Sequence, residues 1–359
     1  MTGTRTRTSA AAVKPRRQGA NAAVSAFEVE VRSVRRLSAN FQRITFGGEC
    51  LRSFGVQGST DDLRIKVVIP PVAEDGTRQQ LPELNCDDTG WYQNWLAMDA
   101  QQRGSMRTYT VRASRCAAPA PEIDVDFVLH FDADGVGGPA SAWAAQAQPG
   151  DRVTVIGPNA VHCVTAESYG GIEWRPGLAR HVLLAGDETA VPAVASILEN
   201  LPEGVTGHAL LEIPDETDAQ PISTRSGVVI TWLPRGGRPH GELLERAVRE
   251  AVAVPGYASL GTADGAPPAT VAPGRGQEPE EVDIDSAILW ETPARLTPEI
   301  VESSPSPNTP AGALPFYAWI AGEAAVVRGL RRYLVRDAGI DRKQVAFMGY
   351  WRHGRAELS

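Results

Sequence analysis

Cationic, aromatic and hydroxyl side chains are grouped between residues 107 and 112, where the sequence reads Arg-Thr-Tyr-Thr-Val-Arg. In a β-strand Arg107 and Tyr109 share one face, so a guanidinium that binds a diphosphate would stand beside a phenol that packs against a ring or ribose. The hydroxyl or amide of Thr110 could reach the edge of such a ring. The same residue types also suit an ordinary half-exposed strand. Taken alone, the run leaves both interpretations open.

A second candidate site is a glycine loop between an apolar strand and a helix start. The strand spans Val125–Phe131 with His130 near its end, and the loop leads into Gly138-Pro139-Ala140-Ser141. Glycine lets backbone approach a ligand, proline suits the first helical turn, and the free amides of that turn attract anions. A diphosphate would fit there. The alternative is a capped helix that binds nothing.

A third candidate site follows the apolar run His181–Ala185, which continues through Asp187-Glu188-Thr189-Ala190 into an apolar helix. This order predicts a buried parallel strand that leads into a helix, and open α/β sheets bind ligands at the carboxyl ends of such strands. The Gly-x-Gly-x-x-Gly fingerprint is missing from the sequence. An ordinary Rossmann dehydrogenase is therefore disfavoured, whereas nicotinamide binding by a glycine-poor turn is not.

The end of the chain repeats the strand and turn pattern. Phe316–Ala321 reads as a strand, Gly322-Glu323 as its turn, and Val345–Trp351 as a last strand that leads into Arg352. Aromatic and cationic side chains thus meet near the C-terminus. For Tyr350 and Trp351 the alternative interpretation is core packing.

Together these segments resemble the siderophore-interacting proteins, which are flavin-dependent ferric-siderophore reductases. The likeness runs in order over residues 24 to 250 and 314 to 357. It is carried by Arg107-x-Tyr109-Thr110, by His130 with Gly138-Pro139-Ala140-Ser141 and Trp143, by Ala185-Gly186-Asp187-Glu188-Thr189-Ala190-x-Pro192-Ala193, by Trp319-x-Ala321-Gly322-Glu323, and by Gly349-Tyr350-Trp351-Arg352-x-Gly354.

The resemblance implies a ferredoxin-reductase-like fold, with an N-terminal antiparallel β-barrel that binds FAD and a C-terminal α/β domain with a parallel sheet that binds NADPH or NADH. The expected organisation is a disordered basic tail at 1–23, the barrel at 24–165, a linker at 166–179, and the nucleotide domain at 180–359 with a Pro/Gly-rich insertion at about 254–313.

The resemblance also assigns roles to residues. It implies that the cofactors are bound by Arg107, Tyr109, Thr110, His130, Gly138, Pro139, Ala140, Ser141, Asp187, Glu188, Thr189, Ala190, Gly322, Glu323, Tyr350 and Trp351. Lys66 and Arg352 match the places where cations for the iron chelate are expected, whereas Asn159 stands where these proteins often carry a basic residue. For a 2′-phosphate, Arg225, Arg235 and Arg238 lie near strand ends, with plain loop charges as the alternative.

The implied reaction needs a flavin because a nicotinamide gives two electrons as hydride, whereas ferric iron accepts one. The siderophore already fills the iron coordination sphere, so neither a catalytic side chain nor a protein ligand to the metal is required. Consistently, the six histidines and four cysteines show no metal-ligand spacing. We therefore expect an NAD(P)H-dependent reductase that releases Fe(II) for intracellular iron acquisition. The alternatives are an NAD(P)H flavin oxidoreductase with a non-iron acceptor and a siderophore-binding protein without turnover.

The net charge and the hydropathy of the chain narrow its possible partners and its cellular location. The formal net charge of −8 argues against a nucleic-acid partner, because duplex binders normally present a basic face. Apolar runs are of strand length, well short of the roughly 20 residues of a membrane-spanning helix, and the first 20 residues lack the apolar segment of a secretory signal. These features predict a cytoplasmic protein, which we expect to be a monomer.

Overall fold

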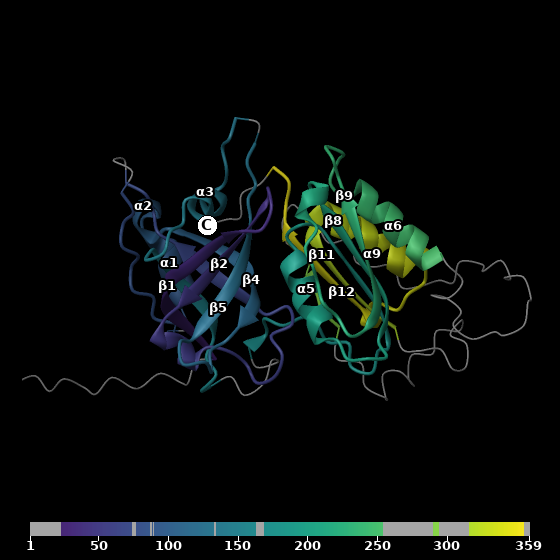
Figure 1. Ribbon diagram of the computed structural model, residues 1–359, viewed down its shortest axis with the longest axis horizontal. Coiled ribbons are helices and arrows are strands. Elements are labelled where there is room, and N and C mark those ends of the chain that lie inside the picture. The colour runs from purple at the N-terminus through teal and green to yellow at the C-terminus, as the bar shows by residue number, and fades with distance from the viewer. Residues whose placement is uncertain are drawn as a thin grey trace, which may run out of the picture.

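The computed structural model describes residues 23–73, 77–86, 88, 90–132, 134–162, 169–253, 290–293 and 316–354. A β-barrel and a sheet with flanking helices lie side by side (Figure 1). Most of the predicted insertion and nearly all of the predicted tail lie outside the described residues. Within the described ranges, no helix combines the length and apolarity that a membrane crossing requires.

The N-terminal part is a closed antiparallel barrel with the strand order β1-β2-β5-β4-β3-β6. Its interior is filled by alternate strand residues such as Ile44 and Phe46, because side chains of a strand point in turn to opposite faces. The strands are β1 (Val24–Arg36), β2 (Phe41–Gly47), β3 (Arg64–Ile69), β4 (Ser105–Ser114), β5 (Glu122–Val128) and β6 (Arg152–Pro158).

Short helices cover the barrel. A 3-10 turn, η1 (Glu49–Ser53), follows β2, and α1 (Trp91–Ala97) and α2 (Ala100–Arg103) precede β4. Trp95 of α1 packs on the outer face of the barrel, so these helices form a small second core there. Helix α3 (Pro139–Ala145) packs on the barrel through Trp143, whose ring stacks on Phe46 at 6.2 Å.

The C-terminal part is a six-stranded sheet with the order β10-β12-β11-β7-β8-β9, in which only β10 is antiparallel to its neighbour. Helix α5 covers the face toward the barrel, and α6 and α9 cover the opposite face (Figure 1). The elements are β7 (His181–Gly186), α5 (Val191–Asn200), β8 (Thr206–Ile213), η2 (Glu216–Asp218), β9 (Gly227–Pro234), α6 (Glu242–Ala253), β10 (Trp290–Glu291), β11 (Phe316–Glu323), α9 (Ala324–Arg332) with the π-helical turn η3 (Tyr333–Asp337), η4 (Arg342–Gln344) and β12 (Val345–Trp351).

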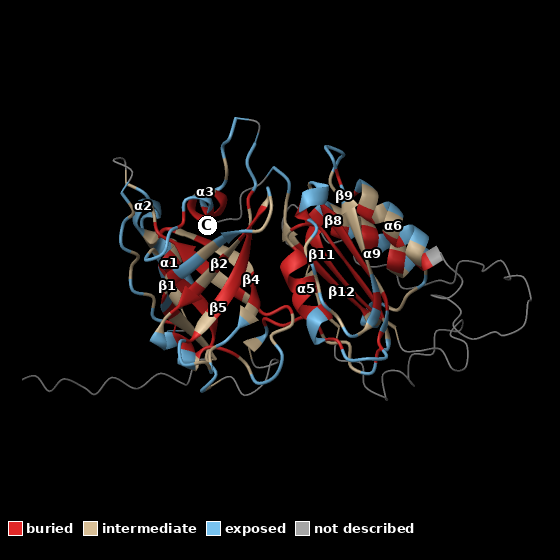
Figure 2. Ribbon diagram, in the orientation of Figure 1, coloured by how far each residue is buried: buried red, intermediate tan, exposed pale blue. Residues whose placement is uncertain are grey.

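This architecture confirms the predicted antiparallel β-barrel followed by an α/β domain with a largely parallel sheet. The central strands are buried on both faces, which explains their unbroken apolar runs (Figure 2). Helix α9 begins after Glu323, whose side chain caps it, and changes to a π-helical turn at Tyr333.

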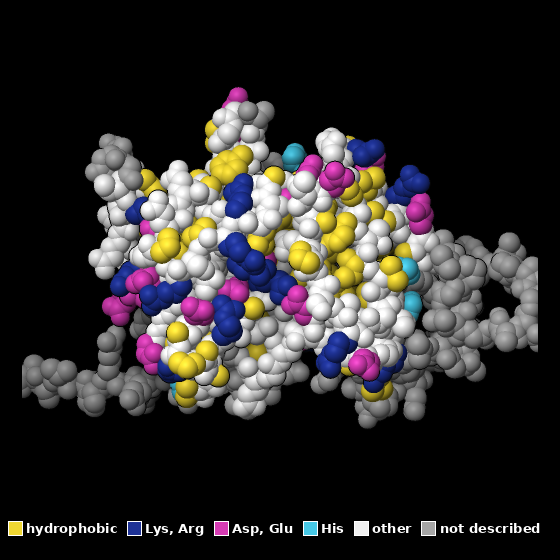
Figure 3. Space-filling model, viewed as in Figure 1, with side chains coloured by type: hydrophobic (Ala, Val, Ile, Leu, Met, Phe, Trp, Pro, Cys, Tyr) yellow, Lys and Arg dark blue, Asp and Glu magenta, His cyan; other side chains and the backbone are white. Residues whose placement is uncertain are grey.

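Ion pairs on the barrel surface extend to the sheet domain. Lys and Arg side chains gather on the face that Figure 3 presents, interspersed with acidic ones. Arg43 pairs with Asp126 inside the barrel domain, and Arg112 forms a bidentate pair with Glu199 of α5 at 2.7 and 2.6 Å. Arg43 and Arg112 are therefore neutralised by acidic partners.

Asp62, just before β3, joins the two domains from a buried position. Its Oδ1 accepts a hydrogen bond from the Trp174 amide at 3.0 Å, and its Oδ2 accepts one from Trp319 Nε1 of β11 at 2.9 Å. Burial raises the pKa of Asp62 to about 6, although these hydrogen bonds act against the shift. A barrel carboxylate therefore holds the central sheet of the other domain.

We expect Asp62→Asn to flatten the pH dependence of stability and to lower stability overall. The folded pKa of about 6 exceeds the reference value of 3.8, so ionisation opposes folding, and stability from this group is complete below pH 3.8 and lost as the pH rises through 6. An asparagine does not titrate, and its amide nitrogen cannot accept a hydrogen bond, which costs about 1–3 kcal/mol. Thermal unfolding from pH 4 to pH 7 measures both effects. An unchanged slope would contradict this role of Asp62.

Candidate active site

The polar cluster of the sheet domain lies where the strand order reverses. From β7 the chain extends the sheet first through β8 and β9 and then, on the other side, through β11 and β12. Ligands of open α/β sheets bind at the carboxyl ends of strands beside such a switch point. Asp187 directly follows β7, Glu323 ends β11 and Trp351 ends β12, so three sequence-predicted residues meet at this edge.

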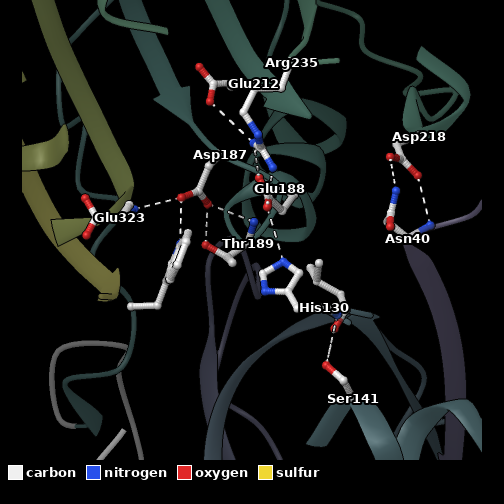
Figure 4. Close-up of polar contacts among 12 residues, drawn as sticks. Asn40, His130, Ser141, Asp187, Glu188, Thr189, Glu212, Asp218, Arg235 and Glu323 are labelled. Atoms are coloured by element: carbon white, nitrogen blue, oxygen red, sulfur yellow. Dashed lines mark hydrogen bonds and ion pairs between the residues drawn. The ribbon is translucent and has the colours of Figure 1, made fainter. Parts of the chain in front are cut away.

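Asp187 is the centre of this cluster (Figure 4). Its Oδ2 accepts hydrogen bonds from the Glu323 amide at 2.7 Å and from Trp351 Nε1 at 2.8 Å. Its Oδ1 accepts from the amide and the hydroxyl of Thr189 at 2.9 and 2.5 Å. Burial and the neighbouring charge of Glu188 raise the pKa of Asp187 to about 6, against these hydrogen bonds. This carboxyl group therefore titrates close to neutral pH.

Gly322 makes room for this carboxylate. Its φ is +143°, a conformation that residues with a side chain rarely adopt, and a Cβ built on it would lie 2.6 Å from Asp187 Oδ2. Glycine is therefore required at the end of β11 both for the backbone and for the acid.

Glu188 points the other way and forms a buried network. It receives two hydrogen bonds from Arg235 at 2.8 and 3.0 Å, and His130 Nε2 lies 3.2 Å from its Oε1 (Figure 4). Burial acts to raise the pKa of Glu188, but the hydrogen bonds from His130 and Arg235 outweigh it and lower the pKa to about 2. Adjacent carboxyl groups whose pKa values are driven apart are characteristic of functional sites.

His130 connects the barrel to this edge. Its amide donates to Ser141 Oγ at 3.1 Å, and its ring lies 5.8 Å from the ring of Trp351. Two further histidines, His240 and His353, contact the same indole. The glycine loop of the barrel and the carboxyl ends of the sheet therefore face each other.

The predicted diphosphate site has an open helix start. Gly138 precedes α3 without a side-chain cap, Pro139 takes the first turn, and a Cβ on Gly138 would meet nothing within 4 Å. Ser141 Oγ is already engaged, since it accepts from His130 and donates to the Val128 carbonyl. The exposed, uncapped start of α3 at Gly138 and Pro139 thus leaves room for a bound diphosphate.

The motif on β4 lies in the barrel wall. Arg107 and Tyr109 pair with Val67 and Ile65 of β3, so they share the face that the sequence predicts. Tyr109 is half-buried and packs against Phe127 at 4.3 Å, which leaves part of the phenol accessible. Arg107 donates to the Met106 carbonyl at 2.8 Å. Thr110 is buried, with 6% of its surface exposed.

Tyr350 and Trp351 have different environments although they are neighbours. Trp351 belongs to the Asp187 cluster, whereas Tyr350 stacks on Trp290 at 5.9 Å and meets Trp319 edge-on. The Tyr350 hydroxyl is buried without a hydrogen-bond partner among the described residues. Tyr350 therefore fits the alternative of core packing, whereas Trp351 lies at the switch point.

Of the cations expected for the chelate, Lys66 lines a pocket of about 140 Å³ on the barrel, where its Nζ donates to Thr108 Oγ1 at 2.7 Å. Arg352 is half-buried directly after β12. Asn159 is engaged elsewhere, since its Nδ2 donates to Ser25 Oγ at 2.9 Å. In place of a basic residue, the chain therefore has an asparagine at this position that is hydrogen-bonded to β1.

The three arginines considered for a 2′-phosphate are placed very differently. Arg235 is buried and paired with Glu188 and Glu212, so its donors are already engaged. Arg225 precedes β9 and lies at the amino end of that strand. Arg238 alone follows β9 with an exposed side chain. Arg235 is thus neutralised by two acidic residues from neighbouring segments, and a contact of any of the three arginines with a 2′-phosphate stays a prediction.

Sequence reasoning missed the position of Arg64, which lines the same pocket as Lys66, and the pairing of Arg235 with Glu212. Arg64 is two residues from Lys66 on the same strand, so period-two spacing could have placed both on one face. The Arg235 pairing crosses segments far apart in the chain, and the sequence holds no local signal for it.

Comparisons with known proteins agree with this geometry. The family described as "Siderophore-interacting FAD-binding domain" matches residues 30–162, and the family described as "Siderophore-interacting protein" matches residues 179–354. The barrel is thus an FAD-binding domain.

Individual relatives also match large parts of the chain. An uncharacterized protein of Mycobacterium tuberculosis is 30% identical over 91% of this chain and 90% of its own length. The ferric vibriobactin reductase of Vibrio cholerae is 32% identical over 62% of this chain and 72% of its own length. The crystal structure of a siderophore utilization protein from T. fusca has a TM-score of 0.62 and 26% identity, and it covers 95% of this chain and 98% of that one. The chain therefore belongs to the siderophore-interacting protein family.

Proposed function

We propose that the protein is an NAD(P)H-dependent flavoenzyme that reduces ferric-siderophore complexes and releases Fe(II). The observation that carries this proposal is the contact of His130 with Glu188, which sets the glycine loop of the FAD-binding barrel against the switch point of the sheet. Relatives support it, because one is named ferric vibriobactin reductase and another, from Escherichia coli, NADPH-dependent ferric-chelate reductase at 30% identity over 57% of this chain and 70% of its own length.

Residues of both domains would hold the cofactors. Arg107 and the amides that begin α3 would bind the FAD diphosphate, and Tyr109 would pack beside the ring or ribose. Bound FAD supplies the step from a two-electron donor to a one-electron acceptor. The nicotinamide would bind at the carboxyl ends of β7, β11 and β12.

The carboxyl groups at the switch point have separate tasks. Glu188 stays ionised at neutral pH and orients His130 through Nε2. Asp187 has a pKa of about 6, so it takes up and releases a proton near neutrality. When it is protonated, a donor among its four contacts loses its acceptor. The position of the Trp351 indole is therefore coupled to proton uptake at Asp187.

An anaerobic two-stage experiment tests this function. The FAD-loaded protein is titrated with NADPH and separately with NADH while the flavin absorbance is followed, and the reduced protein is then mixed with ferric chelates or free flavins. We expect rapid reoxidation by a ferric chelate, with Fe(II) appearing in the same phase. Reoxidation by free flavins alone would identify a flavin oxidoreductase, and a protein that binds chelate but no FAD would be a binding protein.

Arg107→Ala is expected to weaken FAD binding by about 1.5–3 kcal/mol, because a charge-assisted contact to phosphate is lost. Equilibrium dialysis of FAD against the apoprotein measures the change. The matched control is Arg152→Ala, which removes an exposed cation of β6. Equal FAD affinity in both variants would exclude Arg107 from the diphosphate site.

A further inference from the structure

Two cations of β3 line one small pocket on the barrel. Arg64 and Lys66 are two residues apart and therefore lie on the same face of the strand, and both line the cavity of about 140 Å³, together with Thr108 of β4 and Tyr169, Gly170 and Gly171. The volume is well below the roughly 300–1,000 Å³ of a pocket for a whole drug-sized ligand. The pocket can accept one arm of a larger molecule.

The Arg64 guanidinium is held in place on two sides. Its Nη2 donates to Glu173 Oε1 at 2.7 Å, and its Cζ lies 4.0 Å above the ring of Trp290. The Arg64 Nε is buried and has no hydrogen-bond partner among the described residues. A guanidinium that is held in place and lines a pocket is suited to an anionic ligand.

Trp290 and Thr292 fix the same carboxylate from the other domain. Trp290 Nε1 donates to Glu173 Oε1 at 3.2 Å, and Thr292 Oγ1 donates to Glu173 Oε2 at 2.7 Å. Glu291, between them, pairs with Arg331 of α9 at 2.7 Å. The segment Trp290–Thr292, called the strap below, thus links the sheet domain to Arg64.

Two of the described side chains that line the pocket are cationic, and none of its described lining residues is acidic. Glu173 is shared by Arg64 at 2.7 Å and Arg175 at 4.0 Å, so one carboxylate faces two guanidinium groups. The Lys66 ammonium donates to a neutral hydroxyl of Thr108. Asp62 is close to Glu173 but is turned toward the Trp174 amide and the Trp319 indole.

We infer that Arg64 and Lys66 together bind an anionic arm, such as a carboxylate, of the ferric chelate, and that Trp290 and Glu173 are positioning residues for Arg64. This inference rests on the proposed function. It also adds a second cation on the strand that carries Lys66. Because the strap belongs to the sheet domain and positions Arg64, the preference of the pocket for anionic chelates depends on that domain.

Binding of redox-inert gallium(III) chelates tests the inference without turnover. Gallium(III) citrate is anionic, whereas the gallium(III) complex of desferrioxamine B is cationic. We expect Arg64→Gln to weaken binding of the citrate complex about tenfold to hundredfold, as for a lost charge-assisted contact. Binding of the cationic complex should not weaken. The control with the same charge change is Arg35→Gln, at an exposed position of β1.

Two conservative variants separate position from charge. Arg64→Lys keeps the charge but loses the planar contact with Trp290, and it should bind the citrate complex with intermediate affinity. Trp290→Ala should weaken citrate binding, and Trp290→Phe, which keeps a ring under Arg64, should restore most of it. A merely structural role of Trp290 would lower the affinity for both chelates equally.

Kinetics with ferric citrate complete the test. Arg64→Gln should raise KM with little change in kcat, and reduction of the flavin by NADPH should stay at the wild-type rate. Wild-type citrate binding in Arg64→Gln, or equal losses for both chelates, would overturn the inference. A wild-type protein that reduces no ferric chelate would refute the proposed function instead, and the gallium affinities would still decide the role of Arg64.

Discussion

Arg235→Met is expected to destabilise the fold by about 3–5 kcal/mol, as when one partner of a buried ion pair is removed. Arg235 lies between Glu188 and Glu212, whose side chains are 1% and 0% exposed. Without the guanidinium both carboxylates remain buried, and Glu188 keeps its contact with His130. Chemical denaturation at neutral pH measures the loss.

The matched control is Arg238→Met, three residues away in the same loop but exposed, which should change stability by less than about 0.5 kcal/mol. The pH dependence gives a second check. Loss of Arg235 removes a main cause of the lowered pKa of Glu188, so its pKa rises and burial then favours the neutral acid. The variant should therefore recover stability as the pH falls. Similar losses in both variants would contradict the network.

Gly322→Ala should be the second most damaging change, with a loss of about 2–4 kcal/mol from backbone strain and overpacking. The added Cβ would stand 2.6 Å from Asp187 Oδ2, which is itself held by Glu323 and Trp351. Asp187 must move, so the positions of Thr189 and the indole change with it. Stability and the rate of flavin reduction by NADPH should both fall.

Gly354→Ala separates these two causes. Gly354 also has a positive φ, +75°, but a Cβ there would meet nothing within 4 Å. We expect this variant to lose stability through strain alone and to keep the wild-type rate of flavin reduction. If Gly322→Ala behaves like Gly354→Ala in both measurements, the clash with Asp187 is not significant.

Most of the fold was predictable because the strands and the longer helices have local signals. Strands such as β2 and β7 follow from alternating or continuous apolar residues, and Pro192 and Glu323 mark helix starts. Helix α1 was not predicted, since Trp95 becomes apolar surface only when the outer barrel wall is present. Its stability depends on tertiary packing.

The candidate site was predictable only in part, for the same reason. The ends of the strands can be predicted from the sequence. Asp187, Glu323 and Trp351 could therefore be grouped at one edge of the sheet from the sequence alone. The contacts that cross the domains, such as His130 with Glu188 and Asp62 with Trp319, depend on how barrel and sheet pack. The sequence around residues that make contacts between the two domains shows no pattern from which those contacts could be predicted.

The two residues of β10 also have a consequence for aggregation. They pair antiparallel with Met348 and Phe347 of β12 and so occupy the backbone donors and acceptors along the outer edge of the sheet. An uncovered apolar edge strand is a template on which a neighbouring molecule can add its own strand. A shortened protein that lacks residues 290–292 should therefore self-associate through β12, whereas one that keeps them should stay dispersed.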